Sequence, residues 1–171
     1  MTEVRSADSL SAQDWTARAS DFVALEAYLL DTRQFEAWVE LFEPDGIYWI
    51  PLDPLAPEPG DSLNIAFEGP PRLRQRVARL HSGIAHAQEP PSSTVHLYGG
   101  LLVAEVSEDG CRALVRSALM VHESRLGHRN LVAARCEHRL VADEKGAVHI
   151  EQKRVVLADS DQAQYDLSFI L

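Results

Sequence analysis

Apolar residues in the first half of the chain recur at helical spacing. Between residues 11 and 30 they form one stripe that also contains an acid, with the members Trp15, Ala19, Phe22, Val23, Glu26, Leu29 and Leu30. Ser11, followed three positions later by Asp14, predicts a capped start for this helix. Similar spacing predicts a short helix over residues 34–42 and a third over 73–85, where Pro70-Pro71 suits a helix start.

From residue 94 onward the hydrophobic period changes from 3.6 to 2, which is typical of strands. Strands are predicted over residues 96–106, 111–124, 131–142 and 148–158, after an early short strand at 47–51. Glycine-containing turns between the long strands, around residues 108–110, 126–128 and 144–146, predict antiparallel hairpins. The four later strands are about twice the usual length of five or six residues, which favours a strongly curved sheet covered by helices.

One face of the predicted sheet carries charge. Arg135, Glu137 and Arg139 alternate along one strand, and Glu151 and Lys153 are predicted to pair with them across the sheet. This pattern predicts a sheet surface that faces either solvent or another subunit. The proline-rich stretch over residues 51–60 predicts a loop, and residues 88–93 predict another.

Length and composition fit one domain over residues 1–171, with residues 1–12 as a loose N-terminal arm. A net charge of −10 argues against a nucleic-acid partner, which requires a basic patch. No apolar run approaches the roughly 20 residues of a membrane helix, and the N-terminus lacks a signal-peptide core, so we expect no membrane partner and a cytoplasmic location. Cys111 and Cys136 fall in strand-like segments and are expected to be free thiols.

Several segments together resemble the small (beta) subunits of aromatic-ring-hydroxylating dioxygenases, which contain Rieske and non-haem iron. The segments are residues 29–38, 48–51, 76–85, 90–97, 153–158 and 166–171. The closing Leu-Ser-Phe-Ile-Leu run at 167–171 is the most specific of them, and the resemblance extends over residues 15–171 in order and spacing.

The resemblance implies a fold, a partner and a structural role. The implied fold is α+β: a cone of the nuclear-transport-factor-two-like type, with a curved, mainly antiparallel sheet packed by three N-terminal helices. The implied partner is a large subunit that carries the Rieske iron–sulfur cluster and a mononuclear iron, and electrons arrive from NAD(P)H through a reductase. Three large and three small subunits are expected to assemble, with the small subunits associating as a trimer. No cofactor and no catalytic residue is expected in this chain.

The chain departs from the family pattern beside His96. The family often has arginines where this chain has Ser93 and Val95, and a Ser-Asn-like pair where it has Gly99-Gly100. A subunit interface that uses those arginines must differ here, so a stand-alone relative that has lost its large subunit stays an open alternative.

Two patterns of histidine and cysteine residues are candidates for metal sites. His81 and His86 are five residues apart, which on a helix separates the rings by about 140° and suits one ion poorly. Cys136 and His138 form a single Cys-x-His, whereas a Rieske cluster requires two such ligand pairs. No metal site is therefore predicted.

The rival hypothesis is an enzyme on the same cone. In ketosteroid isomerases the catalytic Asp precedes a proline after the first strand, and here Ile50 precedes Pro51, so that base is missing. A pocket of the scytalone-dehydratase type has candidates in this chain: Tyr28, Asp31, Tyr48, His81 and His96. An Asp beside a His would orient the imidazole and raise its basicity.

Structural interpretations compete with that hypothesis. Asp31 would cap the helix junction and bond to His96 inside a filled core. Glu26, on the apolar stripe, is either a buried acid with a shifted pKa or an edge residue paired with an arginine. A third interpretation is a binding module whose cone holds a small apolar ligand among five aromatic residues: Trp15, Phe22, Phe35, Trp38 and Trp49.

Overall fold

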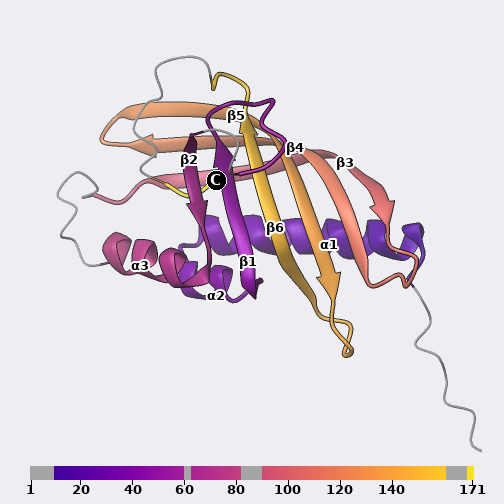
Figure 1. Ribbon diagram of the computed structural model, residues 1–171. Helices are drawn as coiled ribbons and strands as arrows, with labels where there is room; N and C mark the ends of the chain where they lie inside the picture. Colours follow the sequence, from indigo (N-terminus) through magenta and orange to yellow (C-terminus); the bar gives the residue numbers. More distant parts are fainter. Residues whose placement is uncertain (1–9, 60–62, 82–89, 161–168) are drawn as a thin grey trace, which may run out of the picture.

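The computed structural model of the 171-residue chain describes residues 10–59, 63–81, 90–160 and 169–171. It shows one curved, unclosed sheet crossed on one face by a long helix (Figure 1). The helices are α1 (Ala12–Asp31), α2 (Phe35–Val39) and α3 (Pro70–His81). The strands are β1 (Phe42–Pro51), β2 (Asn64–Glu68), β3 (Ser93–Val106), β4 (Arg112–Arg125), β5 (His128–Ala142) and β6 (Val148–Leu157).

The strands lie side by side in the order β2-β1-β6-β5-β4-β3. Every neighbouring pair is antiparallel except β1 and β6, which run parallel. The predicted hairpins between β3 and β6 are confirmed, and Gly110, Gly127 and Gly146 adopt the positive φ values that these turns require, 70°, 79° and 82°.

Helix α1 begins as the sequence predicts. Ser11 Oγ accepts a hydrogen bond from the Asp14 backbone N at 3.2 Å, and the Asp14 carboxylate accepts one from the Ser11 backbone N at 2.9 Å. All seven residues of the predicted stripe are buried. Helix α1 therefore covers the sheet, and it lies closest to β3, while α2 and α3 lie together beside β1 and β2 (Figure 1).

Alternation along the long strands divides the sheet into two faces. The inner face, toward α1, carries buried residues such as Val115 and Leu119, and the outer face carries exposed residues such as Arg116 and Met120. Across β4, β5 and β6 the outer residues stand in rows, and Arg116, Glu137 and Arg154 form one of these rows.

Several predicted boundaries were wrong. Helix α2 ends at Val39, not at residue 42, because Phe42 packs edge-on against Trp38 and pairs with Ile150 at the start of β1. Helix α3 starts at Pro70, and predicted residues 82–85 lie outside the described part of the chain. Strand β2 was not predicted at all. Cys111 lies in an exposed turn before β4, not in a strand.

The prediction that Lys153 lies on the charged face of the sheet was also wrong. A register shift between Arg139 and Leu140 leaves two residues of β6 between the inward-facing Ile150 and Lys153. Lys153 consequently points into the core, and Arg154 stands opposite Glu137 instead.

Candidate functional site

A buried carboxylate, Glu26 on α1, lies at the centre of the cone interior. Four side chains donate hydrogen bonds to it or approach it closely, and we name these five residues the Glu26 cluster. The contacts to the Glu26 carboxylate are Lys153 Nζ at 2.8 Å, Tyr98 Oη at 2.8 Å, Trp38 Nε1 at 3.0 Å and His138 Nε2 at 3.0 Å. Glu26, His138 and Lys153 are each 0% exposed, so the cluster joins α1, α2, β3, β5 and β6 away from solvent.

The charges of the cluster compensate one another. Burial alone would raise the pKa of Glu26, but Lys153 and His138 hold it well below its usual range, so the carboxylate is ionised. Burial and the neighbouring Glu26 carboxylate raise the pKa of Tyr98 well above its usual value, so its hydroxyl remains a donor. The cluster is a buried ion pair with hydrogen-bonding partners, and its carboxylate is ionised and fully engaged.

The end of the chain fills the space beside this cluster. Lys153 Nζ donates to the Leu171 carbonyl O at 2.7 Å, and the Leu171 backbone N donates to Tyr48 Oη at 3.2 Å. Phe169, Ile170 and Leu171 are all buried. Burial raises the pKa of Tyr48, so this hydroxyl stays protonated and serves to hold the chain end in place.

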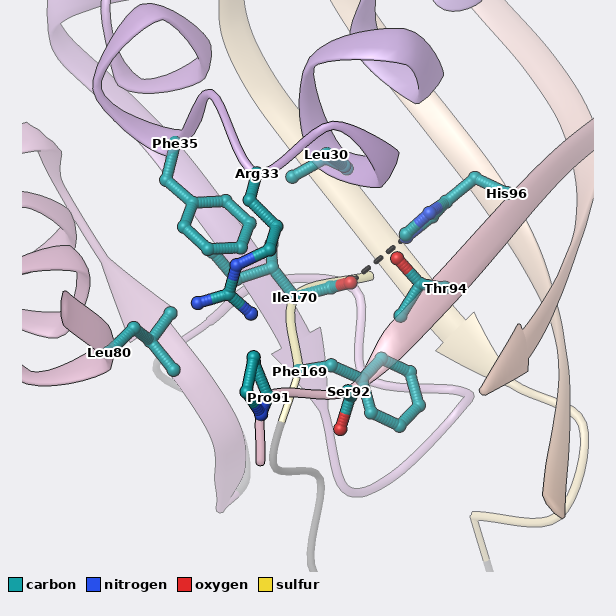
Figure 2. Close-up of a pocket in the computed structure, with 10 residues that line it drawn as sticks. All are labelled: Leu30, Arg33, Phe35, Leu80, Pro91, Ser92, Thr94, His96, Phe169 and Ile170. Atoms are coloured by element: carbon teal, nitrogen blue, oxygen red, sulfur yellow. Dashed lines mark hydrogen bonds between the residues drawn. The ribbon is translucent and has the colours of Figure 1, made fainter. Parts of the chain in front are cut away.

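The buried His96 and the partly buried Asp31 form a second contact. His96 Nδ1 lies 2.6 Å from Asp31 Oδ1. On the other side of the ring, His96 Nε2 lies 2.9 Å from the Ile170 carbonyl O (Figure 2). Both ring nitrogens therefore face oxygen acceptors, an arrangement that a doubly protonated ring satisfies. The predicted bond between the two residues is confirmed. Asp31 does not cap the helix junction, however, because it accepts from Thr94 Oγ1 and the His96 backbone N on β3.

The space beside His96 is small. The pocket drawn in Figure 2 has a cavity volume of about 30 Å³, far below the roughly 150 Å³ of a cavity that binds benzene. Arg33, Phe35 and Leu80 close one side of it, while the side chains of Phe169 and Ile170 close another. An aromatic substrate does not fit there.

Four of the five residues considered for a dehydratase-type pocket have side chains that the structure describes, and of these it brings Asp31 and His96 into direct contact. Asp31 and His96 bond to each other, while Tyr48 holds the chain end. Tyr28 is 59% exposed on α1. His81 is the last residue of α3, and its side chain lies outside the described part of the structure.

The aromatic residues considered as a ligand-binding lining are packed instead. Trp15, Phe22, Phe35 and Trp38 belong to one core cluster of buried side chains. Trp49 lies elsewhere: its Nε1 donates to Asn64 Oδ1 at 2.6 Å, and the Arg154 guanidinium lies 4.7 Å from its ring centre. These residues stabilise the fold, and among them only Phe35 lines one of the described pockets, the small one beside His96.

The donor sets in the part of the chain that the structure describes do not fit iron or an iron–sulfur cluster. In the described ranges, no group of three or more His, Cys, Asp or Glu residues is arranged to hold a metal ion. The nearest approach, Glu26 with His138, has the Lys153 ammonium bonded to the same carboxylate, which opposes a second cation. Burial raises the pKa of Cys136 to about 12, so its thiol stays protonated. Among the described helices, none is long and apolar enough to cross a membrane.

The curved sheet crossed by α1 defines an α+β cone, and comparison with known proteins identifies the family. The model described as "Ring hydroxylating beta subunit" matches residues 25–162. The small oxygenase component of the p-cumate 2,3-dioxygenase system of Pseudomonas putida is 31% identical over 154 residues, covering 86% of this chain and 84% of that protein. The beta subunit of N,N-dimethyl phenylurea N-demethylase of Sphingobium sp. (strain YBL2) is 28% identical over 160 residues, covering 90% and 89%. The chain belongs to the beta-subunit family of ring-hydroxylating dioxygenases.

Solved structures confirm the predicted cone of the nuclear-transport-factor-two-like type. A naphthalene 1,2-dioxygenase structure with indole in its active site has a TM-score of 0.82 at 19% identity and covers 99% of this chain and 92% of its own. The beta subunit of benzoate 1,2-dioxygenase from Burkholderia mallei has a TM-score of 0.73 at 20% identity, with 94% and 98% covered. A more distant cone, ActVI-ORFA of Streptomyces coelicolor, has a TM-score of 0.58 at 14% identity, with 83% and 96% covered.

Proposed function

We propose that this chain is the structural small subunit of a multi-component aromatic-ring-hydroxylating dioxygenase, and that it supports the assembly of an iron-bearing large subunit. The observation that carries the proposal is the family match over residues 25–162. The packing beside α1 supports it, because the chain end, the Glu26 cluster and the paired Asp31 and His96 occupy this part of the interior, and the pocket beside His96 measures only about 30 Å³.

The proposed complex contains a large subunit that the relatives' names imply, since they are called "small oxygenase component" and "subunit beta". We infer a stoichiometry of three large and three small subunits, working in the cytoplasm. The Rieske cluster and mononuclear iron would lie in the large subunit, with electrons supplied from NAD(P)H through a reductase. The small subunit would contribute one folded domain and no catalytic group.

A pull-down from the native cell tests this assignment. The tagged chain is captured and its partner is measured by native mass and by iron and labile-sulfide content. We expect a larger protein in equal amount, together with iron and sulfide. A chain that elutes alone and free of iron and sulfide contradicts the proposal.

Aromatic acids are the first substrates to assay with the captured complex. Relatives of this chain are named for p-cumate, toluate, 2-halobenzoate and benzoate, and each of these compounds carries a carboxylate on an aromatic ring. We infer that the complex acts on a compound of this class, and product formation from one of these acids is the expected result.

The contact between Asp31 and His96 gives the enzyme alternative a specific test. The isolated chain is assayed for dehydratase and isomerase activity, beside Asp31→Asn and His96→Ala variants whose folding is checked by circular dichroism. Our proposal expects no activity in any of the three. Activity in the wild-type chain that a folded Asp31→Asn variant lacks would support the alternative enzyme.

A further inference from the structure

The outer face of the sheet contains a hollow rich in arginine, although the chain carries a net charge of −10. We name it the arginine hollow; its charged members are Arg116, Arg135, Glu137 and Arg154. Arg116 Nε lies 3.0 Å and Arg154 Nη1 lies 3.1 Å from the Glu137 carboxylate. Burial opposes the ionisation of Glu137, but its bonds to these two arginines lower its pKa, so the carboxylate is ionised. One negative charge therefore faces three positive charges, and positive charge is left in excess.

Two of the arginines have hydrogen-bond donors to spare. Arg154 is held in place, because its Nη2 donates to the Ala56 carbonyl O at 2.8 Å while its Nη1 bonds to Glu137. Arg116 bonds to Glu137 through Nε, and in the described ranges its Nη atoms make no hydrogen bond. Over the same ranges Arg135 makes no hydrogen bond or ion pair. Arg135 and the Nη atoms of Arg116 are therefore available to bind an anion.

Small residues give the hollow its depth. Ala118 on β4 stands opposite Arg135 on β5, and a Cβ atom added at Gly100 would meet no atom within 4 Å. The hollow has a volume of about 500 Å³, which lies within the roughly 300–1,000 Å³ of pockets that bind small molecules. Leu55 and Leu102, which are 85% and 58% exposed, are part of its lining. It is therefore an open recess with apolar edges beside a basic wall.

The chemistry of the hollow distinguishes among small anions. A guanidinium group forms two parallel hydrogen bonds with a carboxylate, and its planar face stacks on aromatic rings. A ring that covers the exposed leucines removes their surface from water, which inorganic phosphate and acetate are too small and too polar to do. The ligand that uses both the arginines and the apolar edges is a carboxylate carried on an aromatic ring.

We propose that the arginine hollow is a binding site for a small aromatic carboxylate. The carboxylate bonds to Arg135 and to the free Nη atoms of Arg116, while the ring lies against Leu55 and Leu102. The hollow shares no lining residue with the pocket beside His96, so the site is separate from that pocket. It consists of residues of this chain alone, and it goes beyond the proposed function because no large subunit is needed to form it.

Titration of the isolated full chain with benzoate tests the site. Binding is measured by isothermal titration calorimetry at about 0.15 M salt, where exposed charges more than about 8 Å apart are largely screened. We expect a dissociation constant of about 1 mM or lower. Benzamide has the shape of benzoate without its charge, and acetate has the charge without the ring. Each should bind at least about 10-fold more weakly than benzoate.

An arginine variant and its matched control locate the charge contact. Arg135→Gln removes the unpaired guanidinium and should weaken benzoate binding at least about 10-fold, the smallest loss expected for hydrogen bonds to a charged group. Arg139→Gln removes the same charge from the same exposed face of β5. It lies four residues further along, about 13 Å from Arg135 at roughly 3.3 Å per residue, and outside the hollow. It should therefore bind benzoate like the wild type.

A second pair of variants tests the shape of the hollow without changing any charge. Ala118→Leu fills the space opposite Arg135 and should also weaken benzoate binding at least about 10-fold. Ala133→Leu adds the same side chain on the exposed face of β5 outside the hollow and should leave binding unchanged. Circular dichroism checks that all four variants are folded, and the two pairs test the site independently.

The outcomes separate a built site from general attraction of anions. Binding that is lost in Arg135→Gln and in Ala118→Leu, and kept in both controls, supports the proposal. No benzoate binding at about 10 mM, an equal loss in the two arginine variants, or acetate that binds as tightly as benzoate each overturns it. Capture of a large subunit bears only on the proposed function. A chain that elutes alone but binds benzoate in the hollow keeps this inference while the proposed function fails.

Discussion

Arg33 holds a backbone conformation that usually belongs to glycine. It follows the C-terminus of α1 with φ of 59°, and its backbone N donates to the Leu30 carbonyl O at 3.1 Å. A Cβ atom in this left-handed region costs about 1 kcal/mol. We therefore expect Arg33→Gly to have a free energy of unfolding about 1 kcal/mol higher than Arg33→Ala, measured by urea denaturation.

The comparison of Gly with Ala isolates the backbone effect. Both variants lose the guanidinium that lies 5.4 Å from the Phe35 ring centre, so the loss of that contact cancels. Gly127→Ala is the reverse control: φ there is 79°, and its added Cβ meets open space, so it should destabilise by a similar amount. Equal stability of the two Arg33 variants would contradict the strain argument.

Removing the charge of Glu26 should be among the most damaging single changes in the interior. Glu26→Gln leaves the Lys153 ammonium buried without a counter-charge, and we expect the free energy of unfolding to fall by about 3–5 kcal/mol. Adding Lys153→Met removes that uncompensated charge and should recover part of the loss. Urea denaturation of the two single variants and the double variant measures the coupling; purely additive effects would argue against a buried ion pair.

We expect the Glu26 carboxylate to make the free energy of unfolding fall at acidic pH. Its pKa is lowered in the folded protein, where Lys153, His138 and Tyr98 face it, against an ordinary value of about 4.3 in the unfolded chain. A lowered folded pKa contributes stability that is fully present above about pH 4.3 and is lost as the pH falls toward the folded value.

The measurement for this prediction is the free energy of unfolding from pH 7 down to pH 3. Wild type should lose more stability below about pH 4.3 than the variant that combines Glu26→Gln with Lys153→Met. Asp14, Asp109, Asp143 and Glu137, whose pKa values are also lowered, are present in both proteins, so the difference reports Glu26. Parallel pH profiles would show that Glu26 titrates normally.

At the scale of elements, His96 on β3 joins the end of α1 to the end of the chain. Its ring bonds to Asp31 and to the Ile170 carbonyl O. His96→Phe leaves the Ile170 carbonyl O unpaired and removes one of the hydrogen bonds to the Asp31 carboxylate, so we expect about 2–4 kcal/mol of lost stability and faster amide exchange at Leu171. Thr94→Val removes one bond to the same carboxylate and should cost only about 1 kcal/mol. Unchanged exchange at Leu171 in His96→Phe would mean that the chain end is held without His96.

Elements with a strong hydrophobic periodicity could be predicted from the sequence. Elements whose position depends on pairing with a neighbouring strand could not. The α1 stripe and the β3 to β6 hairpins follow from apolar spacing and turn glycines. Strand β2 has only five residues and pairs with β1 alone, so its alternation is too short to detect. The inward turn of Lys153 depends on a bulge between β5 and β6, which no local pattern encodes.

At the scale of the whole molecule, the family could be predicted from the sequence, but the pairing of the buried charged residues could not. Glu26 stood out as an acid on an apolar stripe, but its partner Lys153 lies 127 positions away, and no spacing rule joins such residues. One signal was available. Of the two lysines, Lys145 lies in a turn and Lys153 in a strand between apolar residues on both sides, Ile150 and Val155, so only the second was suited to pair with a buried acid.

Apolar exposure on the outer face yields a last prediction about assembly. Leu97 on β3 pairs with Met120 on the outer face of the sheet and is 63% exposed, whereas Leu25 on α1 is 46% exposed. Because both side chains are exposed, Leu97→Gln and Leu25→Gln should each change the stability of the isolated chain by less than about 0.5 kcal/mol. If the outer face is covered in the complex, Leu97→Gln should weaken assembly about 10-fold, through the loss of roughly 1–2 kcal/mol of apolar burial, while Leu25→Gln should leave it unchanged. Native mass measurements of both variants at matched concentrations decide the point, and equal assembly by the two proteins would place the interface elsewhere.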